Sequence, residues 1–569
     1  RPSPPPAATT ADAQECARAR IRGLIRPFSL DPRTLVILGA GTVHLRKGVD
    51  LFLACAARVR QLSPTSPVRF VWVGPGFDPE GDAGYSVYLQ DQLTRAGLES
   101  HVTFIGEVAD IDAAYALTDI FLLSSRLDPL PNVAIDAMAL ARPVVCFDQA
   151  TGIAQTLAEG GLAEHCVAPY LDVEAAAHRL VRLIEQPALR KRVGEQSQSL
   201  AAQCFDMDRY VASLTALARD TVKAQVAEQC DGQVIAADQA LRLDFCPHPA
   251  WPTLSYGQAI RAFVRSWASG VDLRKPFPGF HPGLYRHLHG LSQPGRNPLA
   301  DFIEQGRPTG PWLREVITPQ IPVPKSPLPG RIALHIHVHY PELFAAILKP
   351  LESQDLDLDL LISVSSAKAL PEIEDQARQS RHRLAALDLV PNRGRDLGPL
   401  LTLYGERLVR DYDFIGHVHT KRSVAAGDVR VGTTWLNFLI ENLLGGQQAM
   451  ATRILHALHA EPRLGLVFPD DPYVVGWTRN RPEAVRLAAR LGLKDVPEEH
   501  FFFPVGSMFW ARTVALAPLL GLGLRWEDYP LEPLAYDGTL LHALERLLPS
   551  IAQQAGYEFR LCNVPGITR

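Results

Sequence analysis

Two blocks of the sequence alternate between short apolar runs and longer amphipathic segments, and this alternation restricts the fold more than any other feature. In the first block, residues 34–205, the apolar runs are TLVILGA, VRFVWVG, HVTFIG, DIFLLSS and RPVVCFD. In the second block, which starts at residue 331, they are RIALHIHV, DLDLLISVS, DFIGHVHT and RLGLVFP. Strands that alternate with helices predict parallel, doubly wound sheets. We therefore expect an α/β protein with two sheets.

The segment between the two blocks has a different character. It opens with a long amphipathic run, DMDRYVASLTALARDTVKAQVAEQ, and ends in the Pro-rich PQIPVPKSPLPG. Pro/Gly-rich stretches are typical of turns and linkers. We predict two nucleotide-binding, Rossmann-like domains at 34–205 and 331–569, joined by a helical and Pro/Gly-rich connector at 206–330. Residues 1–33 contain no initiating Met, and we expect a flexible tail or the end of a missing upstream domain.

Composition limits the partners and the location of the protein. The chain has 569 residues, of which 47% are hydrophobic and 21% charged, and a net charge of −4, which argues against a nucleic-acid partner. The eight cysteines are scattered singly, a pattern typical of a reducing, cytoplasmic setting. No apolar run approaches the ~18 residues that a bilayer span needs. We therefore expect any membrane contact to be peripheral, on the inner face of the cytoplasmic membrane.

The stretch SSRLDPLPNVAIDAMA places two carboxylates where a strand-like run meets a helix. Asp128 lies in a Pro-x-Pro corner, and Asp136 lies one helical turn further on. The corner exposes the backbone amides of Leu130 and Asn132 beside the positive end of the helix dipole, an arrangement suited to phosphate. Both carboxylates could accept hydrogen bonds from sugar hydroxyls. These features together predict a site for a pyrophosphate with a sugar at each end.

A second element of this site is GAGTVHLRKGVDLF, a Gly-rich turn after a strand. Gly41 would let the backbone approach a ligand, and Arg46 and Lys47 would neutralise phosphate charge. Taken alone, the Gly-x-Gly pattern of GAG is a weak indication of a ligand site. An Arg-Lys pair commonly marks a solvated helix start. An NAD-binding fingerprint is disfavoured because the third Gly is missing.

In their order and spacing, RKGVDLF, SSRLDPLPNVAIDAMA, RPVVCFD and ATGIAQ resemble the donor-binding, carboxyl-terminal domain of group 1 retaining glycosyltransferases with the GT-B fold. The resemblance covers residues 34–205. It implies a nucleotide-diphosphate sugar as donor and no requirement for metal. Two features depart from the family: both family glutamates are aspartates here, and Thr42 stands where the family often has Arg. The family's acceptor domain would lie upstream.

The resemblance also assigns roles to individual residues. Asp128 would bond to hydroxyls of the donor sugar, and Asp136 would bond to the ribose. Arg46 and Lys47 would hold the pyrophosphate, to which the amides of the Pro-x-Pro corner would also donate.

The second block has its own cluster of charged residues at the ends of strand-like runs, in NRGRDLG and HVHTKRS. Its members are Arg393, Arg395, Asp396, His417, His419, Lys421 and Arg422. Cations that converge at strand ends suit a diphosphate, so we assign the arginines, His417 and Lys421 to donor binding. The alternative is that Arg395 pairs with Asp396 and that the histidines are packed.

Catalytic candidates in this block are carboxylates and one histidine. Asp537 and Glu532 could each be the general base that deprotonates an acceptor hydroxyl, and Asp396 and His419 are further candidates. Asp537 could instead cap the helix that follows it. His417 and His419 face the same side of a strand and could bind a divalent cation, but two ligands do not make a site. We therefore predict no firm cofactor.

Four segments of the second block, VPNRGRDLGPLL, DYDFIGHVHTKRS, FFFPVGSMFWAR and LEPLAYDGTLLHALERL, resemble the rhamnan synthesis protein F family over about residues 331–565. This resemblance implies bacterial surface-polysaccharide assembly of the O-antigen or lipopolysaccharide type. The sequence thus predicts a glycosyltransferase that moves rhamnose or a related deoxysugar from a nucleotide-diphosphate donor to a lipid-linked or growing glycan. The alternative is a non-catalytic module that binds nucleotide sugars or glycans.

Overall fold

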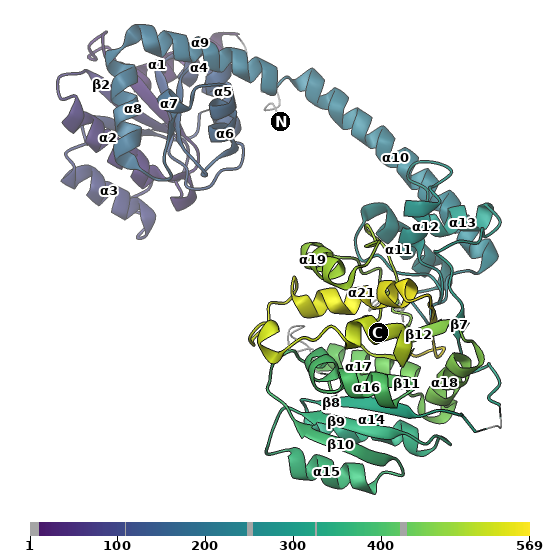
Figure 1. Cartoon of the computed structure of the whole chain (residues 1–569). Coiled ribbons are helices and arrows are strands. Elements are labelled where there is room, and N and C mark those ends of the chain that lie inside the picture. The colour runs from purple at the N-terminus through teal and green to yellow at the C-terminus, as the bar shows by residue number, and fades with distance from the viewer. Residues whose placement is uncertain (1–10, 109, 247–253, 325–326, 422–428) are drawn as a thin grey trace. The chain divides into compact units, whose positions relative to one another are not determined.

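The computed structural model of the chain describes residues 11–108, 110–246, 254–324, 327–421 and 429–569 (Figure 1). It divides into two compact units, residues 1–218 and 219–569. Each unit has its own hydrophobic core and its own sheet, and each is described by itself.

A six-stranded, fully parallel sheet forms the centre of the first unit. Its strands are β1 (Leu35–Ala40), β2 (Val68–Val73), β3 (Val102–Ile105), β4 (Ile120–Leu123), β5 (Val144–Phe147) and β6 (Val167–Ala168). They lie in the order β3-β2-β1-β4-β5-β6, so the strand order reverses between β1 and β4. The strands are mostly Val, Ile, Leu and Phe, as expected for a parallel sheet that is covered on both faces.

Helices cover both faces of this sheet. They are α1 (Ala11–Ile25), α2 (Val49–Leu62), α3 (Tyr85–Arg95), α4 (Ile111–Ala116), α5 (Asn132–Ala139), α6 (Gly152–Glu159), α7 (Ala163–Cys166), α8 (Val173–Glu185) and α9 (Pro187–Cys204). A short 3-10 turn, η1 (Leu45–Lys47), precedes α2. Within the segment expected to be a tail or the end of another domain, α1 buries Ile21 and Ile25 in the core of the unit.

Helix α10 (Met207–Asp238) runs for 32 residues and contains the boundary between the units. Residues 219–330, which belong to the segment predicted as a connector, cluster with the second unit. They form α11 (Tyr256–Ser269), α12 (Pro282–Leu288) and α13 (Pro298–Glu304) around a small aromatic core. Strand β7 (Val316–Ile317), which follows, pairs with the sheet of the second unit. A buried ion pair of 2.6 Å joins Lys275 of this segment to Asp470.

An eight-stranded sheet forms the centre of the second unit. After β7 come β8 (Ile332–Val338), β9 (Asp359–Val364), β10 (Arg383–Leu389), β11 (Phe414–His419), β12 (Leu464–Pro469), β13 (Phe509–Arg512) and β14 (Glu558–Cys562). Their order is β10-β9-β8-β11-β13-β12-β14-β7, with a reversal between β8 and β11. The sheet is parallel except for β13, which runs antiparallel to both of its neighbours.

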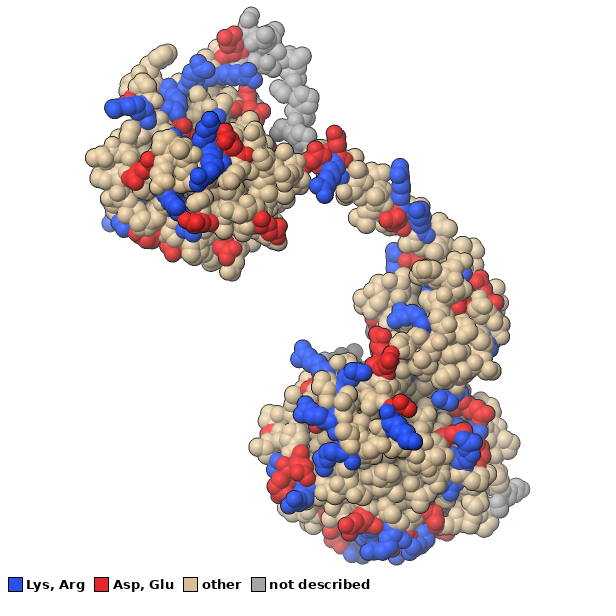
Figure 2. Space-filling view, turned by 45° about the horizontal axis from the view of Figure 1, so that its top comes forward, with Lys and Arg blue, Asp and Glu red and all other residues tan. Residues whose placement is uncertain are grey.

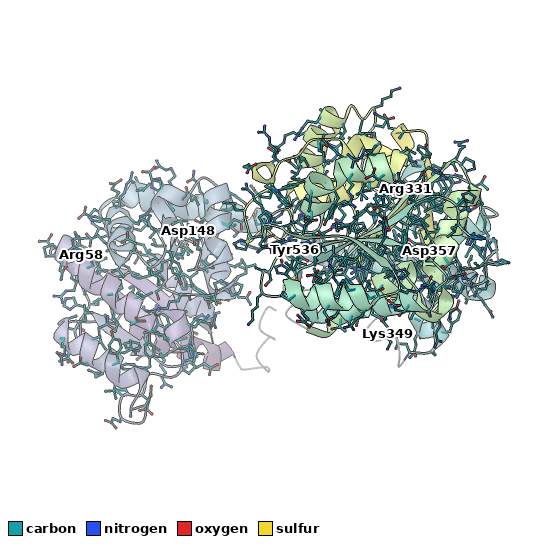
Figure 3. All side chains as sticks on the ribbon, turned by 60° about the horizontal axis from the view of Figure 1, so that its bottom comes forward. Arg58, Asp148, Arg331, Lys349, Asp357 and Tyr536 are labelled. Carbon is teal, nitrogen blue, oxygen red and sulfur yellow. The ribbon has the colours of Figure 1, made fainter. Side chains whose placement is uncertain are left out.

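The second sheet is also buried on both faces. Its helices are α14 (Phe344–Glu352), α15 (Leu370–Gln379), α16 (Gly405–Asp411), α17 (Val429–Leu443), α18 (Met450–Ala460), α19 (Arg481–Leu491), α20 (Ala517–Leu520) and α21 (Leu540–Gln554). Residues of α14, α15, α17 and α18 belong to one core cluster, and residues of α16, α19, α20 and α21 to the other. Figure 3 shows side chains on both sides of this sheet. The predicted fold class, two Rossmann-like α/β domains, is confirmed.

The surface charge agrees with the small net charge of −4. On the face in Figure 2, basic and acidic side chains are intermixed.

Within the described ranges, no helix combines the length and the apolar character that crossing a bilayer requires.

Candidate functional sites at the sheet switch points

The first candidate site lies at the carboxyl ends of β1 and β4, where the strand order reverses. Open α/β sheets bind their ligands at such switch points because the flanking connections diverge there. The β1–α2 connection carries Arg46 and Lys47, and the β4–α5 connection carries Asp128. Arg46 donates to Oδ1 of Asp128 at 3.1 Å, and Lys47 donates to Oδ2 at 2.5 Å. Residues that we predict to bind one ligand are thus brought together.

Burial and backbone conformation fix this cluster. Asp128 is only 7% exposed, and its amide donates to the carbonyl of Ala150 at 2.8 Å. Gly41 has φ +139°, and a Cβ built on it would lie 3.3 Å from Cε of Lys47. Gly48 has φ +66°, and a Cβ there would lie 2.0 Å from the carbonyl oxygen of Ser124. The two connections can approach this closely only because glycine is present.

The remaining predicted donor residues of this unit lie on or beside α5. The helix begins at Asn132, so its first amides face the turn that contains the exposed Leu130. Asp136 is exposed one turn further along. Partial burial, followed by the nearby charge of Asp112, raises the pKa of Asp136. In the described part of the chain, Asp136 makes no hydrogen bond with Asp128 or the cations.

The second candidate site lies where β8 and β11 meet at the reversal of the second sheet. A buried chain of hydrogen bonds leads away from this point. Ser363 contacts His335 at 3.0 Å, His335 contacts His417 at 3.0 Å, and His417 contacts Asp396 at 3.1 Å. Ser507 also donates to Asp396, at 2.5 Å. The parallel register pairs His335 with His417 and His337 with His419, which explains why the rings are neighbours.

The pKa values at the two ends of this chain are shifted in ways that fit its hydrogen bonds. Burial would raise the pKa of Asp396, but His419, His417 and Ser507 outweigh it and hold the pKa well below normal. The ionised Asp396 therefore accepts from Nε2 of His417. Burial holds the pKa of His335 well below normal, so this ring is neutral and uses one nitrogen as donor and the other as acceptor toward His417 and Ser363. The structure thus supports the packed interpretation of His417.

Lys421 follows β11 and lies among charges of both signs. Its ammonium lies 3.4 Å from the ring centre of Trp435. Burial lowers the pKa of Lys421 to about 8, although the charges of Glu545 and Asp396 oppose this shift. Glu545 accepts from the amide of Gly506 at 2.6 Å, and burial raises its pKa.

His419 is buried close to this lysine. Its Nε2 donates to the carbonyl of Gly506 at 3.0 Å and lies 3.8 Å from Asp396, and burial lowers its pKa.

The two predicted arginines differ in their surroundings. Arg393 donates to the carbonyl oxygens of Tyr529 at 2.7 Å and Glu527 at 2.8 Å, so it holds a turn in place. Arg395 is exposed and pairs with Glu532 at 3.3 Å. The alternative that Arg395 pairs with Asp396 is wrong. Arg422 lies outside the described residues.

Asp537 lies before α21 but does not cap it. The N-cap residue of α21 is Thr539, so the prediction that Asp537 caps this helix is wrong. Asp537 accepts from the hydroxyl of Thr478 at 2.5 Å, from the amide of Arg479 at 3.1 Å and from the side chain of Asn480. These bonds outweigh burial and lower its pKa to about 2. In this structure the carboxylate therefore holds the loop that contains Thr478, Arg479 and Asn480.

Acidic and histidine side chains are candidates for metal ligands in both units. Among the residues that the structure describes, no three His, Cys, Asp or Glu side chains are placed to hold an ion. Asp411 pairs with Arg410 at 3.0 Å, and Asp413 accepts from the amide of Arg331 at 2.8 Å. Asp411 ends α16 and Asp413 directly precedes β11, so both carboxylates are engaged at the junction between this helix and this strand.

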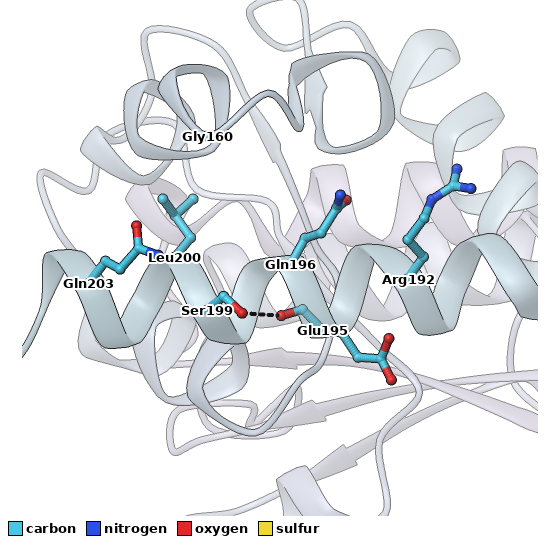
Figure 4. Close-up of a pocket in the computed structure, with 7 residues that line it drawn as sticks. All are labelled: Gly160, Arg192, Glu195, Gln196, Ser199, Leu200 and Gln203. Atoms are coloured by element: carbon cyan, nitrogen blue, oxygen red, sulfur yellow. Dashed lines mark hydrogen bonds between the residues drawn. The ribbon is translucent and has the colours of Figure 1, made fainter.

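A hollow of about 340 Å³ lies on the first unit, away from the residues above (Figure 4). It is lined by Gly160, Arg192, Glu195, Gln196, Ser199, Leu200 and Gln203. Most of these side chains come from α9, and the Ser199 hydroxyl donates to the carbonyl of Glu195 within that helix. None of the predicted donor-binding residues contributes to it.

Sequence reasoning missed several polar residues at both switch points. In the first unit these are Asp50 and Arg126, which form an ion pair of 2.6 Å between the two connections. In the second they are His335 and His337, which stand inside a run that looks apolar. The alternation in LHIHV could have pointed to them, since both histidines fall on one face of the strand.

Two parts of the chain match models of known families. Residues 32–186 match the family described as Glycosyl transferases group 1. Residues 312–557 match the family described as Rhamnan synthesis protein F. The chain therefore contains a group 1 glycosyltransferase domain followed by a rhamnan synthesis protein F domain, and both predicted resemblances are confirmed.

Curated relatives cover parts of the chain. The uncharacterized protein WxcX of Xanthomonas campestris pv. campestris (strain B100) is 30% identical over 225 residues, which are 39% of this chain and 31% of the relative. Mannosylfructose-phosphate synthase of Agrobacterium fabrum is 27% identical over 34% of this chain and 43% of the relative. The lipopolysaccharide core biosynthesis mannosyltransferase LpsB of Rhizobium meliloti is 28% identical over 24% of this chain and 38% of the relative. The chain thus spans less than half of the length of each.

Solved structures also resemble a part of the chain. The Anabaena Alr3699/HepE complex with UDP and glucose is 23% identical, with a TM-score of 0.30, over 37% of this chain and 52% of that one. WaaG, a glycosyltransferase involved in lipopolysaccharide biosynthesis, is 19% identical, with a TM-score of 0.27. The likeness covers 32% of this chain and 46% of WaaG.

Proposed function

We propose that this chain is a tandem, nucleotide-sugar-dependent glycosyltransferase of bacterial surface-polysaccharide synthesis. Each unit binds a nucleotide-diphosphate sugar at the switch point of its sheet. The observation that carries this proposal is the meeting of Arg46 and Lys47 with Asp128 at the β1/β4 switch point, inside a group 1 glycosyltransferase domain. The relatives that are named as lipopolysaccharide core mannosyltransferases support the same class of product.

In the first unit, the two cations bind the diphosphate and the amides at the start of α5 donate to it. Asp136 binds the ribose, and Asp128 binds hydroxyls of the sugar. Both oxygens of Asp128 contact cations in the free protein. Donor binding therefore exchanges part of this ion pair for contacts between the cations and the phosphates.

Of the predicted donor-binding cations of the second unit, Arg393 and His417 are engaged in the fold. The diphosphate is therefore assigned to Lys421 and to the exposed Arg395, which would exchange its pair with Glu532 for the phosphates. The donor sugar is rhamnose or a related deoxysugar, in keeping with the rhamnan synthesis protein F match. The acceptor is a lipid-linked or growing glycan. The protein works in the cytoplasm, with peripheral contact to the membrane that holds such an acceptor.

A tandem arrangement has a physical advantage for polymer synthesis. A product that leaves one site meets the second site at the effective concentration set by the link between them, which for short flexible links is of the order of millimolar.

The test of this function is turnover by the full chain. The protein is incubated with UDP-, GDP- and dTDP-sugars, and the release of nucleoside diphosphate is followed with and without a glycan acceptor from bacterial lipopolysaccharide. Release that depends on Lys47 or Lys421 supports a transferase. Donor binding without any release would instead support a non-catalytic nucleotide-sugar module.

A further inference from the structure

We propose that Arg126 and Asp50 are a positioning pair, which holds Arg46 and Lys47 in the orientation that a diphosphate requires. The proposal rests on the proposed donor site of the first unit. Neither residue has been assigned a role by the comparison with known families, and neither contacts Asp128.

The pair joins the two connections that form the switch point. Arg126 follows β4, and Asp50 lies in the first turn of α2. Two parallel hydrogen bonds of 2.7 and 2.6 Å link the guanidinium to both oxygens of Asp50. The side chains are 27% and 14% exposed, so the pair is more shielded from water than a surface ion pair. Bidentate pairs of this kind fix direction as well as distance.

Arg126 also binds the turn that carries the two cations. Its guanidinium donates to the carbonyl of Leu45 at 2.9 Å, and its amide donates to the carbonyl of Arg46 at 2.8 Å. Nearby, the hydroxyl of Ser124 donates to the carbonyl of Lys47 at 3.2 Å. All three carbonyls of η1 are therefore bonded to the end of β4. This leaves the Arg46 and Lys47 side chains directed at Asp128.

Tyr85 completes the pair from α3. Its hydroxyl donates to Oδ1 of Asp50 at 2.7 Å and accepts from the amide of Asp50 at 3.0 Å. Burial alone would raise the pKa of Asp50, but the bonds from Arg126 and Tyr85 outweigh it and lower the pKa. Asp50 is therefore charged at neutral pH.

These contacts separate a positioning role from a binding role. The guanidinium of Arg126 is hydrogen-bonded to Asp50 and to the carbonyl of Leu45. Arg126 would therefore act on a ligand indirectly, by holding η1 in place. A cation that is already oriented loses less freedom when it binds, so loosening η1 should weaken binding without removing any group that touches the ligand.

The experiment measures the binding of UDP, GDP and dTDP to the full chain by calorimetry, with Lys47→Ala identifying the site in the first unit. We expect Arg126→Ala and Asp50→Ala each to weaken binding about tenfold, and the double variant to be no weaker than either alone. Arg126→Lys keeps the positive charge but cannot make the two parallel hydrogen bonds to Asp50. The affinity of this variant should lie between those of wild type and Arg126→Ala.

The matched control is Arg58→Ala. Arg58 also lies on α2 and pairs with a carboxylate, Glu174, at 2.5 Å, but none of its contacts reaches η1. Its loss should leave affinity within about twofold of wild type.

A second measurement does not depend on any ligand. Hydrogen exchange of the peptide that contains residues 41–50 should become faster in Arg126→Ala and Asp50→Ala, and not in Arg58→Ala.

Two results would overturn the proposal. The first is unchanged exchange together with unchanged affinity in both variants. The second is loss of affinity in Arg126→Ala but not in Asp50→Ala, which would make Arg126 a direct ligand of the phosphate. If no nucleoside diphosphate binds at Lys47, the proposed function of the first unit fails, while the exchange data still report whether the pair orders η1.

Discussion

In the proposed function, two roles compete for the carboxylate of Asp128. By its place in the family pattern it should bind sugar hydroxyls, yet in the free protein both of its oxygens contact Arg46 and Lys47. Aspartate is one methylene shorter than the glutamate that the pattern usually has, and here its carboxylate lies on the two cations. The carboxylate thus pairs with the two cations that the proposed function assigns to the diphosphate.

Asp128→Asn tests this competition. Removing the charge frees both cations, so affinity for a nucleoside diphosphate without sugar should rise roughly fivefold, equivalent to about 1 kcal/mol. The preference for the nucleotide sugar over the nucleoside diphosphate should shrink, because one acceptor of sugar hydroxyls is lost. Calorimetry with both ligands measures this. Asp148→Asn, at an exposed carboxylate after β5, is the control, and an equal loss for both ligands would contradict the account.

Under the proposed function, we expect diphosphate binding in the second unit to depend on pH through Lys421. Its pKa of about 8 means that the ammonium is charged below pH 8 and neutral above it. From pH 7 to pH 9 the charged fraction falls from about nine-tenths to about one-tenth, so affinity for a diphosphate should fall over this range. Lys421→Arg should remove the dependence because Arg stays charged. The same decline in both proteins, measured by titration with nucleoside diphosphates, would show that Lys421 is not the group responsible.

At the scale of elements, strand periodicity and turn composition predict much of the architecture. Arg46, Lys47 and Asp128 could be placed together because each follows a strand and the ends of parallel strands share one edge. The antiparallel direction of β13 could not be predicted, since pairing direction leaves no local pattern. The hydrogen-bond partners of Arg393 and Asp537 could not be predicted from the sequence either, because they lie more than 50 residues away in the chain.

The buried histidines of β8 and β11 tie these strands to the turn after β10 through Asp396. Asp396→Asn should destabilise the second unit by about 2 kcal/mol at pH 7, because a buried bond to a charged group is weakened. The pKa of Asp396 is lower in the folded than in the unfolded chain, so this contribution exists at pH 7 and is lost as the pH falls below about 4. The difference between the variant and wild type should therefore shrink in acid.

Urea unfolding followed by tryptophan fluorescence measures this effect. Of the eight tryptophans, Trp72 alone lies in residues 1–218, so the signal reports mainly on the second unit. Asp411→Asn, which removes an exposed pair with Arg410, should change stability by less than about 0.5 kcal/mol. Equal effects of the two substitutions would count against the buried chain as a structural element.

For the whole molecule, the central claim is that one chain carries two separate diphosphate sites. Each unit has its own core, sheet and switch point, and the unit boundary lies within the single helix α10. Two sites of this kind can be removed one at a time, since no residue of one belongs to the other.

The most direct test is saturation-transfer NMR of the full chain with UDP-, GDP- and dTDP-sugars, compared among wild type, Lys47→Ala, Lys421→Ala and the double variant. The account predicts that each single variant loses transfer to one donor, or part of the transfer to a shared donor, and that the double variant loses it all. Full transfer in the double variant would contradict the assignment of both switch points as donor sites.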